Sequence, residues 1–348
     1  WTRDPYVPVE ENGYIFGRGA QDNKYDVAMM VATLAALKKD GFRPRRSVIL
    51  LLSGDEETAM TTTQALAVKY KDAELLLNGD GGGGLLGEDN KPVMYRLQGG
   101  EKTYADFDVS FTDPGGHSSR PTATNPLYRM AHALERLEAY RFPPMANELT
   151  RATLMAASRI TPGEAGAALA AYAKDPTDQA AADLLSAQSL FVGQIRTTCV
   201  ATMASAGHAP NALPQRASFT INCRIFPGTS VDSVKADLVR VMAEPTATVK
   251  TIGTPPESDA SPMRKDVTDV IGRAIAARYP GTAVVPSMDA GQTDSVYFRA
   301  QGVPSYGVAS LFIRGGDSFL HGLNERVPVA GIAGSLEQWD LVVRTLAK

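Results

Sequence analysis

The sequence predicts an α/β protein in which helices cover a mostly parallel sheet and a smaller α+β module is inserted. Three observations lead to this fold class. Short apolar runs alternate with helical patterns in the first hundred residues, as in strand–helix–strand units. A strictly alternating strand and further strand patterns fill the middle of the chain. The helical spacing returns at the end in one long amphipathic helix.

The first part of the chain has the pattern of a buried sheet with covering helices. Apolar residues recur at helical spacing over 26–39, which predicts a helix. The run VILLL then predicts a strand over 47–53 that is buried on both faces. A helix at about 61–70 and a second apolar strand at 74–77 complete a strand–helix–strand unit.

The middle of the chain predicts an antiparallel module. Residues 105–111 alternate between apolar and polar, as in a half-exposed strand. The elements that follow are expected in the order helix, strand, strand, helix, strand, at 126–140, 196–205, 217–226, 231–242 and 248–252. This is the β-α-β-β-α-β order of a ferredoxin-like module. An alanine-rich helical stretch at about 164–190 interrupts it, and the last helix of the chain runs to Leu346.

The composition changes near Gly100 and near Pro255, which predicts two domains. Residues 1–100 and 255–348 would together form the discontinuous α/β domain. Residues 101–254 would form the inserted α+β module, with a helical insertion of its own at about 145–195.

Composition and charge exclude several classes of protein. Thirty-five Lys and Arg residues against 38 Asp and Glu residues give a net charge of −3. This balance does not suit a protein that binds nucleic acid or an anionic membrane by bulk charge. The longest stretch without a formal charge, 197–215, contains polar residues and two prolines, so it is not a transmembrane helix. We expect neither a nucleic-acid nor a membrane partner.

The two cysteines leave an open question. Cys199 and Cys223 each lie 12 residues from Asn211, so they could face each other on the two strands of a hairpin. They could equally be two small buried apolar residues. The sequence leaves both the pairing and the redox compartment open.

Acidic residues follow the two predicted strands of the first domain. Asp55, Glu56 and Glu57 come after the strand at 47–53, and Asp80 comes after the strand at 74–77. Because functional groups gather beyond the carboxyl ends of parallel strands, these carboxylates are expected at one edge of the sheet. A bound cation would relieve their mutual repulsion, and oxygen ligands with a histidine suit zinc. Any one of them alone could instead be a solvated residue or a helix N-cap.

Two of the four histidines are placed for chemistry. His117 lies in the turn GGHSS and His321 lies in the segment FLHGLNE, whereas His132 falls inside a predicted helix. The glycines at 17–24 are not preceded by a buried strand, and neither a P-loop nor a G-x-S-x-G elbow occurs. Nucleotide binding and serine-hydrolase chemistry are therefore not expected.

Taken together, these motifs resemble the co-catalytic di-zinc peptidases and amidohydrolases of peptidase clan MH. That family includes carnosinase, carboxypeptidase S, aminoacylase and succinyl-diaminopimelate desuccinylase. The motifs occur in the family's order and span nearly all of the chain. They are Gly17-Arg18-Gly19…Asp22…Lys24, Gly54-Asp55-Glu56-Glu57, Asp80, Gly115-Gly116-His117-Ser118, Pro210-Asn211…Pro214, Arg224…Pro227-Gly228, Gly291…Thr293-Asp294 and His321-Gly322…Asn324-Glu325.

The resemblance implies a set of metal ligands. Asp22 would bridge two zinc ions, and Glu57 with His321 would complete one of the two sites. Asp80 would belong to the other site, together with a histidine from an H-x-D segment that the family places ahead of residue 1. We therefore expect two Zn²⁺ per chain in the full-length protein, and a sequence that begins inside the catalytic domain.

The resemblance also implies roles for four other residues. Glu56 would act as general base on a metal-bridging water. His117 would hydrogen-bond the developing oxyanion, and in dimeric relatives this histidine comes from the neighbouring subunit. Arg224 and Asn211 would hold a free carboxylate of the substrate, although Arg224 could instead be an exposed strand residue and Asn211 a turn residue. The module at 101–254 matches the family's lid or dimerisation domain.

The expected activity is zinc-dependent hydrolysis of an amide bond in a small peptide or N-acyl amino acid with a free carboxylate. This covers a metallopeptidase of dipeptidase or carboxypeptidase type and an N-acyl-amino-acid amidohydrolase, acting as a homodimer. Asp80 resembles the dipeptidase and carboxypeptidase S side, since many deacylases carry Glu there, and Tyr25 replaces a glycine common in relatives. The alternative is a non-catalytic binding or structural member with an incomplete metal site. Relatives often follow an export signal, which favours a periplasmic or secreted location and leaves a cytoplasmic one open.

Overall fold

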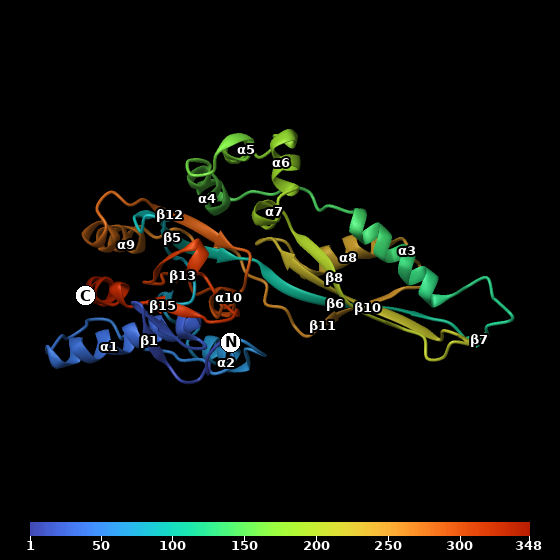
Figure 1. Ribbon diagram of the computed structural model, residues 1–348, viewed down its shortest axis with the longest axis horizontal. Helices are drawn as coiled ribbons and strands as arrows, with labels where there is room; N and C mark the ends of the chain where they lie inside the picture. Colours follow the sequence, from blue (N-terminus) through green and yellow to red (C-terminus); the bar gives the residue numbers. More distant parts are fainter. The chain divides into compact units, whose positions relative to one another are not determined.

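The computed structural model describes residues 1–348, which divide into two compact units (Figure 1). Unit 1 comprises Trp1–Gly100, Ala260–Asp289 and Thr293–Lys348. Unit 2 comprises Glu101–Asp259 and Ala290–Gln292. Unit 1 is therefore assembled from both ends of the chain, and unit 2 from its middle. The roles of the two units as catalytic domain and lid stay predictions.

Unit 1 contains a six-stranded sheet of mixed orientation. Its strand order is β14-β4-β5-β13-β3, and β12 also pairs with β5. The pairs β13·β3 and β14·β4 are parallel, whereas β5 runs antiparallel to β4 and β13. The strands are β3 (Leu76–Asn78), β4 (Gly83–Leu86), β5 (Pro92–Glu101), β12 (Val284–Asp289), β13 (Ser305–Gly307) and β14 (Phe312–Arg314). The predicted α/β class is confirmed, but the long strand β5 makes the sheet mixed rather than mostly parallel.

Helices pack against this sheet and complete the core of unit 1. The main helices are α1 (Tyr25–Lys39), α9 (Lys265–Arg278) and α11 (Ile332–Leu346), and α2 (Thr61–Lys69) and α10 (Ser295–Ala300) are shorter. Tyr95 and Leu97 of β5, Tyr306 of β13 and Ile271 of α9 are completely buried in one apolar cluster. A small antiparallel sheet of β1 (Val9–Glu11), β2 (Tyr14–Phe16) and β15 (Arg326–Pro328) joins the N-terminal segment to the segment before α11.

The predicted buried strand at 47–53 was wrong. These residues belong to no strand or helix, and Val48, Ile49 and Leu52 are 41%, 55% and 57% exposed. The sheet ends at β3, which pairs only with β13, so no ladder includes 47–53. A strand needs a partner for its backbone N–H and C=O groups, and an apolar run alone does not provide one.

Unit 2 contains a four-stranded antiparallel sheet in the order β11-β6-β10-β8. The strands are β6 (Thr103–Thr112), β8 (Thr198–Ala206), β10 (Arg216–Ile225) and β11 (Thr248–Ile252), and the helices are α3 (Pro126–Ala139) and α8 (Val231–Met242). Phe107, Val109 and Phe111 are completely buried in a core that also contains side chains of α3 and α8. The alternation of β6 thus directs one face of the sheet toward both helices. A two-stranded sheet of β7 (Gly116–His117) and β9 (Ala212–Leu213) lies at one end of this unit (Figure 1).

Four helices make up the helical insertion that the sequence predicts at about 145–195. They are α4 (Glu148–Ser158), α5 (Gly163–Lys174), α6 (Gln179–Ser186) and α7 (Ser189–Ile195). Asn147 caps α4 through a capping box with Thr150, and the Asp178 side chain caps α6. Because alanine favours helix throughout this stretch, the polar caps mark where new helices begin. Leu169, Tyr172 and Leu185 are fully buried in a core that the four helices share.

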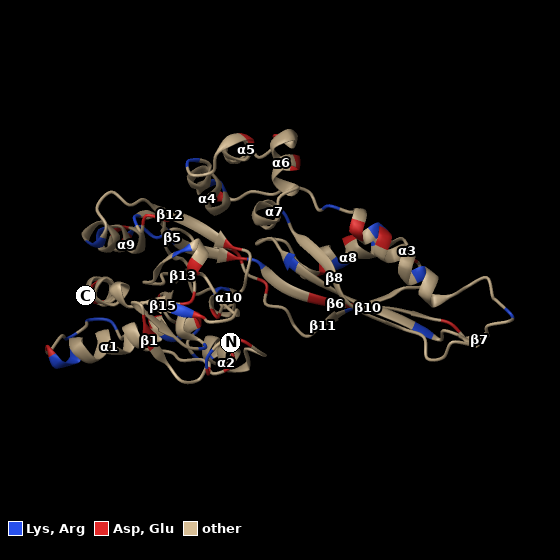
Figure 2. Ribbon diagram, in the orientation of Figure 1, with Lys and Arg blue, Asp and Glu red and all other residues tan.

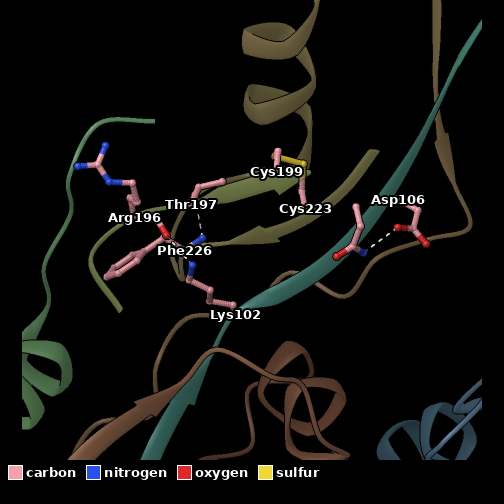
Figure 3. The surroundings of a disulfide bond; sticks show 8 residues. Lys102, Asp106, Arg196, Thr197, Cys199, Cys223 and Phe226 are labelled. Carbon is pink, nitrogen blue, oxygen red and sulfur yellow. Dashed lines mark hydrogen bonds between the residues drawn. A yellow bond between two sulfur atoms is a disulfide. The ribbon is translucent and has the colours of Figure 1, made fainter. Parts of the chain in front are cut away.

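A disulfide bond joins two neighbouring strands of unit 2 (Figure 3). Cys199 of β8 lies directly opposite Cys223 of β10 in the antiparallel register. Cys223 is completely buried and belongs to the core beneath α3 and α8. The structure therefore answers the question that the sequence left open: the two cysteines pair.

Loss of the disulfide is expected to destabilise unit 2 by about 3 kcal/mol, because it closes a loop between residues 24 apart in sequence. The double variant Cys199→Ser/Cys223→Ser should unfold at a lower urea concentration than the oxidised wild type. Wild type treated with a thiol reductant should match the double variant and serves as its control. Equal unfolding midpoints for all three proteins would contradict the expectation.

The distribution of charged residues and the lengths of the helices agree with what the composition predicts. Charged residues of both signs are scattered over each unit (Figure 2). The longest helices, α1 and α11, have 15 residues each, and no helix combines the length and apolarity that a membrane span requires.

Candidate functional site

Unit 1 brings three of the predicted metal ligands together. Asp22, Glu57 and His321 each place one ligand atom within 4.8 Å of the others. The Nε2 atom of His321 lies 3.0 Å from a carboxylate oxygen of Asp22 and 3.0 Å from one of Glu57. Asp22 precedes α1, Glu57 lies in the turn before α2, and His321 lies in the loop before β15. Three segments that are distant in sequence thus converge on one point.

The electrostatics of this cluster favour a cation. Burial, and then the negative charge of Glu57, raise the pKa of Asp22 above its ordinary value. The charge of Glu57 also contributes most to raising the pKa of His321. Without a metal, a proton on His321 would compensate the two carboxylates. One imidazole nitrogen with two carboxylate oxygens is a donor set that zinc accepts, so the residues fit the predicted ion.

Asp55 is the acidic residue of this segment that binds the start of a helix. Its carboxylate accepts hydrogen bonds from the backbone N–H groups of Thr61 and Thr62, at 2.7 and 3.1 Å, and from both hydroxyls. The side-chain hydrogen bonds from these threonines lower the pKa of Asp55 to about 2. Met60 occupies the N-cap position of α2, so Asp55 is not the N-cap residue that the sequence allowed for, but it binds the first two N–H groups of the helix from the preceding turn.

Glu56 and Asp80 are the two predicted site residues of unit 1 that lie outside the group of Asp22, Glu57 and His321. Glu56 directly precedes Glu57, and Asp80 follows β3 in a turn where its backbone N–H donates to the Asn78 side chain at 2.8 Å. Asp80 is not a member of the group formed by Asp22, Glu57 and His321. Its role as ligand of a second ion, and that of Glu56 as base, stay predictions.

Asp294 is a supporting residue that the sequence reasoning did not assign. Its carboxylate accepts hydrogen bonds from Ser53 at 2.7 Å and from Thr63. These two residues flank the turn that carries Glu56 and Glu57, so Asp294 anchors both ends of that turn. The sequence signal for this residue is Thr293-Asp294, which is among the motifs of the resemblance.

Unit 2 carries the other three predicted residues, at two separate places. His117 of β7 pairs with Ala212, and the N–H of Ser118 donates to the Asn211 carbonyl at 3.0 Å, so His117 and Asn211 are neighbours. Arg224 of β10 lies opposite Tyr104, with its guanidinium 4.6 Å from the centre of that ring.

The two places are at opposite ends of the antiparallel pair β6·β10. From Tyr104 to Thr112, where β6 ends before β7, the strand advances eight residues, or about 27 Å. One copy of unit 2 therefore cannot present Arg224 and Asn211 to the same carboxylate.

The fold and the metal-ligand cluster define an α/β protein with a candidate metal centre. The chain matches the peptidase family M20/M25/M40 over residues 1–345 and belongs to this family. The resemblance found in the sequence motifs is thereby confirmed.

Two named relatives illustrate the sequence similarity. The chain is 25% identical over 341 residues to N-fatty-acyl-amino acid synthase/hydrolase PM20D1 of Homo sapiens, with 94% of this chain and 67% of that protein covered. It is 30% identical over 239 residues to carboxypeptidase S of Saccharomyces cerevisiae, with 64% of this chain and 41% of that protein covered. The chain spans about two thirds of the length of the first of these relatives.

Solved structures share the fold. The M20 family metallo-carboxypeptidase Sso-CP2 of Sulfolobus solfataricus superposes with a TM-score of 0.71 at 17% identity, covering 99% of this chain and 80% of that chain. Human carnosine dipeptidase 1 gives a TM-score of 0.63 at 15% identity, with 100% and 77% covered.

Zinc binding is expected to release a proton from His321, because a metal ligand must be the neutral imidazole. The pKa of His321 in the metal-free protein is raised above its ordinary value of 6.5, so protons compete with zinc for the imidazole at a higher pH than they would for an ordinary histidine. Zinc affinity should therefore fall as the pH is lowered toward 6.5. Titration calorimetry at pH 6.5, where the raised pKa keeps His321 mostly protonated before zinc is added, should give different binding heats in two buffers of different ionisation enthalpy. His321→Ala should remove the difference together with most of the affinity; identical heats for the wild type would contradict the expectation.

Proposed function

We propose that this protein is a zinc-dependent hydrolase that cleaves an amide bond in a small peptide or N-acyl amino acid bearing a free carboxylate. The observation that carries the proposal is the convergence of Asp22, Glu57 and His321, with Glu56 adjacent to one of these ligands. Family membership and relatives named as a carboxypeptidase and an N-fatty-acyl-amino acid synthase/hydrolase support the substrate class.

The chain's own residues would divide the chemistry between them. Asp22, Glu57 and His321 would hold one zinc ion, and Asp80 would be a ligand of a second ion. Bound zinc supplies a Lewis acid and an activated water. Glu56 would accept the proton of that water and return it to the leaving amine. His117 would donate a hydrogen bond to the developing oxyanion, and Arg224 would hold the carboxylate of the substrate.

The test combines metal content with hydrolysis. The protein should bind two zinc ions per chain and should hydrolyse dipeptides or N-acyl amino acids. Substrates with an amidated C-terminus should be poor, since the planar guanidinium of Arg224 would lose its carboxylate partner. A protein that binds no zinc, or that binds zinc without hydrolysing either class, would support the non-catalytic alternative and overturn the proposal.

We further propose that the protein works as a homodimer in which His117 and Asn211 serve the partner's metal centre. The support comes from unit 2 alone, where about 27 Å of strand separates these two residues from Arg224. A second copy removes the conflict, because each centre can then take Arg224 from one chain and His117 with Asn211 from the other.

Mixing two inactive variants is expected to restore activity in such a dimer. Glu56→Gln and His117→Ala would each be inactive alone. In the mixed dimer, the centre of the His117→Ala chain keeps Glu56 and receives His117 from its partner. Equal mixing with exchange should recover about one quarter of wild-type activity. The control is a mixture of His117→Ala with the double variant Glu56→Gln/His117→Ala, which should stay inactive because neither chain supplies His117. If the first mixture recovered no activity, His117 would serve the metal centre of its own chain.

We also propose a periplasmic or secreted location, which the disulfide between Cys199 and Cys223 supports because such bonds persist in oxidising compartments. Thiol labelling of the protein in intact producing cells would test this location. Quantitative labelling of both cysteines would oppose it.

A further inference from the structure

A buried carboxylate lies directly behind the metal-ligand cluster of unit 1. Glu325 ends the segment that begins with His321, and its side chain is completely buried. The reaction proposed above gives it no role. One carboxylate oxygen accepts hydrogen bonds from the backbone N–H groups of Gln21 at 2.8 Å and Asp22 at 3.0 Å. The other oxygen accepts from the N–H of Gly19 at 2.9 Å and from Arg18 at 3.0 Å.

These four donors all come from the turn that carries the metal ligand Asp22. The backbone carbonyl of Glu325 adds a fifth contact, since it accepts from the N–H of Gly17 at 3.1 Å. Gly19 adopts a left-handed conformation, with φ of 75°, as it presents its N–H to the carboxylate. A buried charge is tolerated when hydrogen bonds compensate it fully, and charge-assisted bonds of this kind are the strong ones.

Arg18 extends the connection to the second ligand segment. Its guanidinium contacts Glu325 with one nitrogen and donates to the carbonyl of Gly322 at 2.8 Å with the other. Gly322 directly follows His321. The pair Arg18–Glu325 therefore ties the turn of Asp22 to the loop of His321, so that two of the three converging ligands share one rigid support.

We propose that Glu325 is a positioning residue that holds Asp22 and His321 in the arrangement that binds the metal, before the metal arrives. The inference rests on the zinc centre of the proposed function. Groups that orient metal ligands from behind typically change metal affinity 10–100-fold when they are removed. Glu325 acts on the backbone of Asp22 rather than on its carboxylate, which leaves the ligand atoms available to the metal.

The variant Glu325→Gln tests this directly. It keeps the size of the side chain but replaces one acceptor oxygen by an NH₂ group, which would then face two donors. A matched control exists in the same unit. Asp317 is also buried, at 5% exposure, and its carboxylate accepts from Tyr14, Arg314 and Arg326, none of which belongs to the turn of Asp22 or the loop of His321. Asp317→Asn therefore removes a comparable buried charge that accepts no hydrogen bond from the turn of Asp22.

Two measurements separate positioning from general stabilisation. In the metal-free protein, hydrogen exchange of the peptide spanning 17–24 should become faster in Glu325→Gln and stay unchanged in Asp317→Asn. The zinc dissociation constant, measured by competition with a chromophoric chelator, should rise 10–100-fold in Glu325→Gln and less than threefold in the control. If Glu325→Gln does not fold, Arg18→Lys takes its place, because it keeps the charge but cannot reach both Glu325 and Gly322.

The outcomes decide between the inference and the function on which it rests. Wild-type zinc affinity in Glu325→Gln would overturn the positioning role, whether or not exchange changed. Equal loss of affinity in Asp317→Asn would also overturn it, because the effect would then follow from stability alone. A wild-type protein that binds no zinc would overturn the proposed function itself and the metal role of Glu325 with it.

Discussion

Replacing Glu56 by glutamine is expected to lower kcat by about 10²–10⁴-fold, the range that a positioned general base contributes. An amide cannot accept the proton of the attacking water, while its size leaves the turn between Ser53 and Thr63 intact. Because Asp294 anchors both ends of that turn, the neighbouring ligand Glu57 should keep its position. Zinc content, measured alongside steady-state hydrolysis, should therefore equal that of the wild type.

The neighbouring residue provides the contrast. Glu57→Gln removes a ligand from the cluster with Asp22 and His321, so both zinc affinity and turnover should fall. Wild-type-like kcat in Glu56→Gln would remove Glu56 from the mechanism. Loss of zinc in Glu56→Gln would instead show that it binds metal rather than moving protons.

Replacing Lys102 by methionine is expected to remove a strong pH dependence from the stability of unit 2. Lys102 is completely buried, and its ammonium group donates to the carbonyl of Arg196 (Figure 3). Burial, and then the positive charge of Arg224, lower the pKa of Lys102 to about 7. In the unfolded chain the lysine keeps its proton up to about pH 10.4.

The sign follows from proton binding. Between about pH 7 and 10.4 the unfolded chain binds a proton that the folded protein has released, so wild-type stability should rise with pH. The rise should be of order 5 kcal/mol over that range, at about 1.4 kcal/mol for each pKa unit. Urea unfolding of Lys102→Met at several pH values should show that rise abolished. Lys250→Met, an exposed lysine on β11 of the same sheet, should retain it; a persistent rise in Lys102→Met would assign the dependence to other groups.

Sequence patterns predicted the secondary structure correctly where it depends mainly on the residues of the segment itself. The helix expected at 26–39 is α1, and the alternation of 105–111 matches the buried face of β6. The motifs predicted Asp22, Glu57 and His321 as metal ligands, and the structure adds what motifs cannot contain, namely that these three distant segments meet.

Predictions failed where structure depends on a neighbour. The run at 47–53 has the composition of a buried strand, but no strand pairs with it. The pairing of Cys199 with Cys223 required the register of β8 against β10, which spacing suggested without deciding. Glu325 belongs to a motif that gives it no role, and Lys102 belongs to no motif. A charged residue gives no sign in the sequence that it will be buried, and the importance of these two lies in the donors and acceptors around them.

The exposed segment at 47–53 also has a consequence for handling the protein. Its sequence SVILLLS has high β-propensity, no charge and no proline, the features of segments that assemble between chains. The open edge of β3 lies in the same unit and offers unpaired backbone groups. Solubility should therefore limit work on a protein of these 348 residues before stability does, and a charged substitution at the 57%-exposed Leu52 is the first change to try.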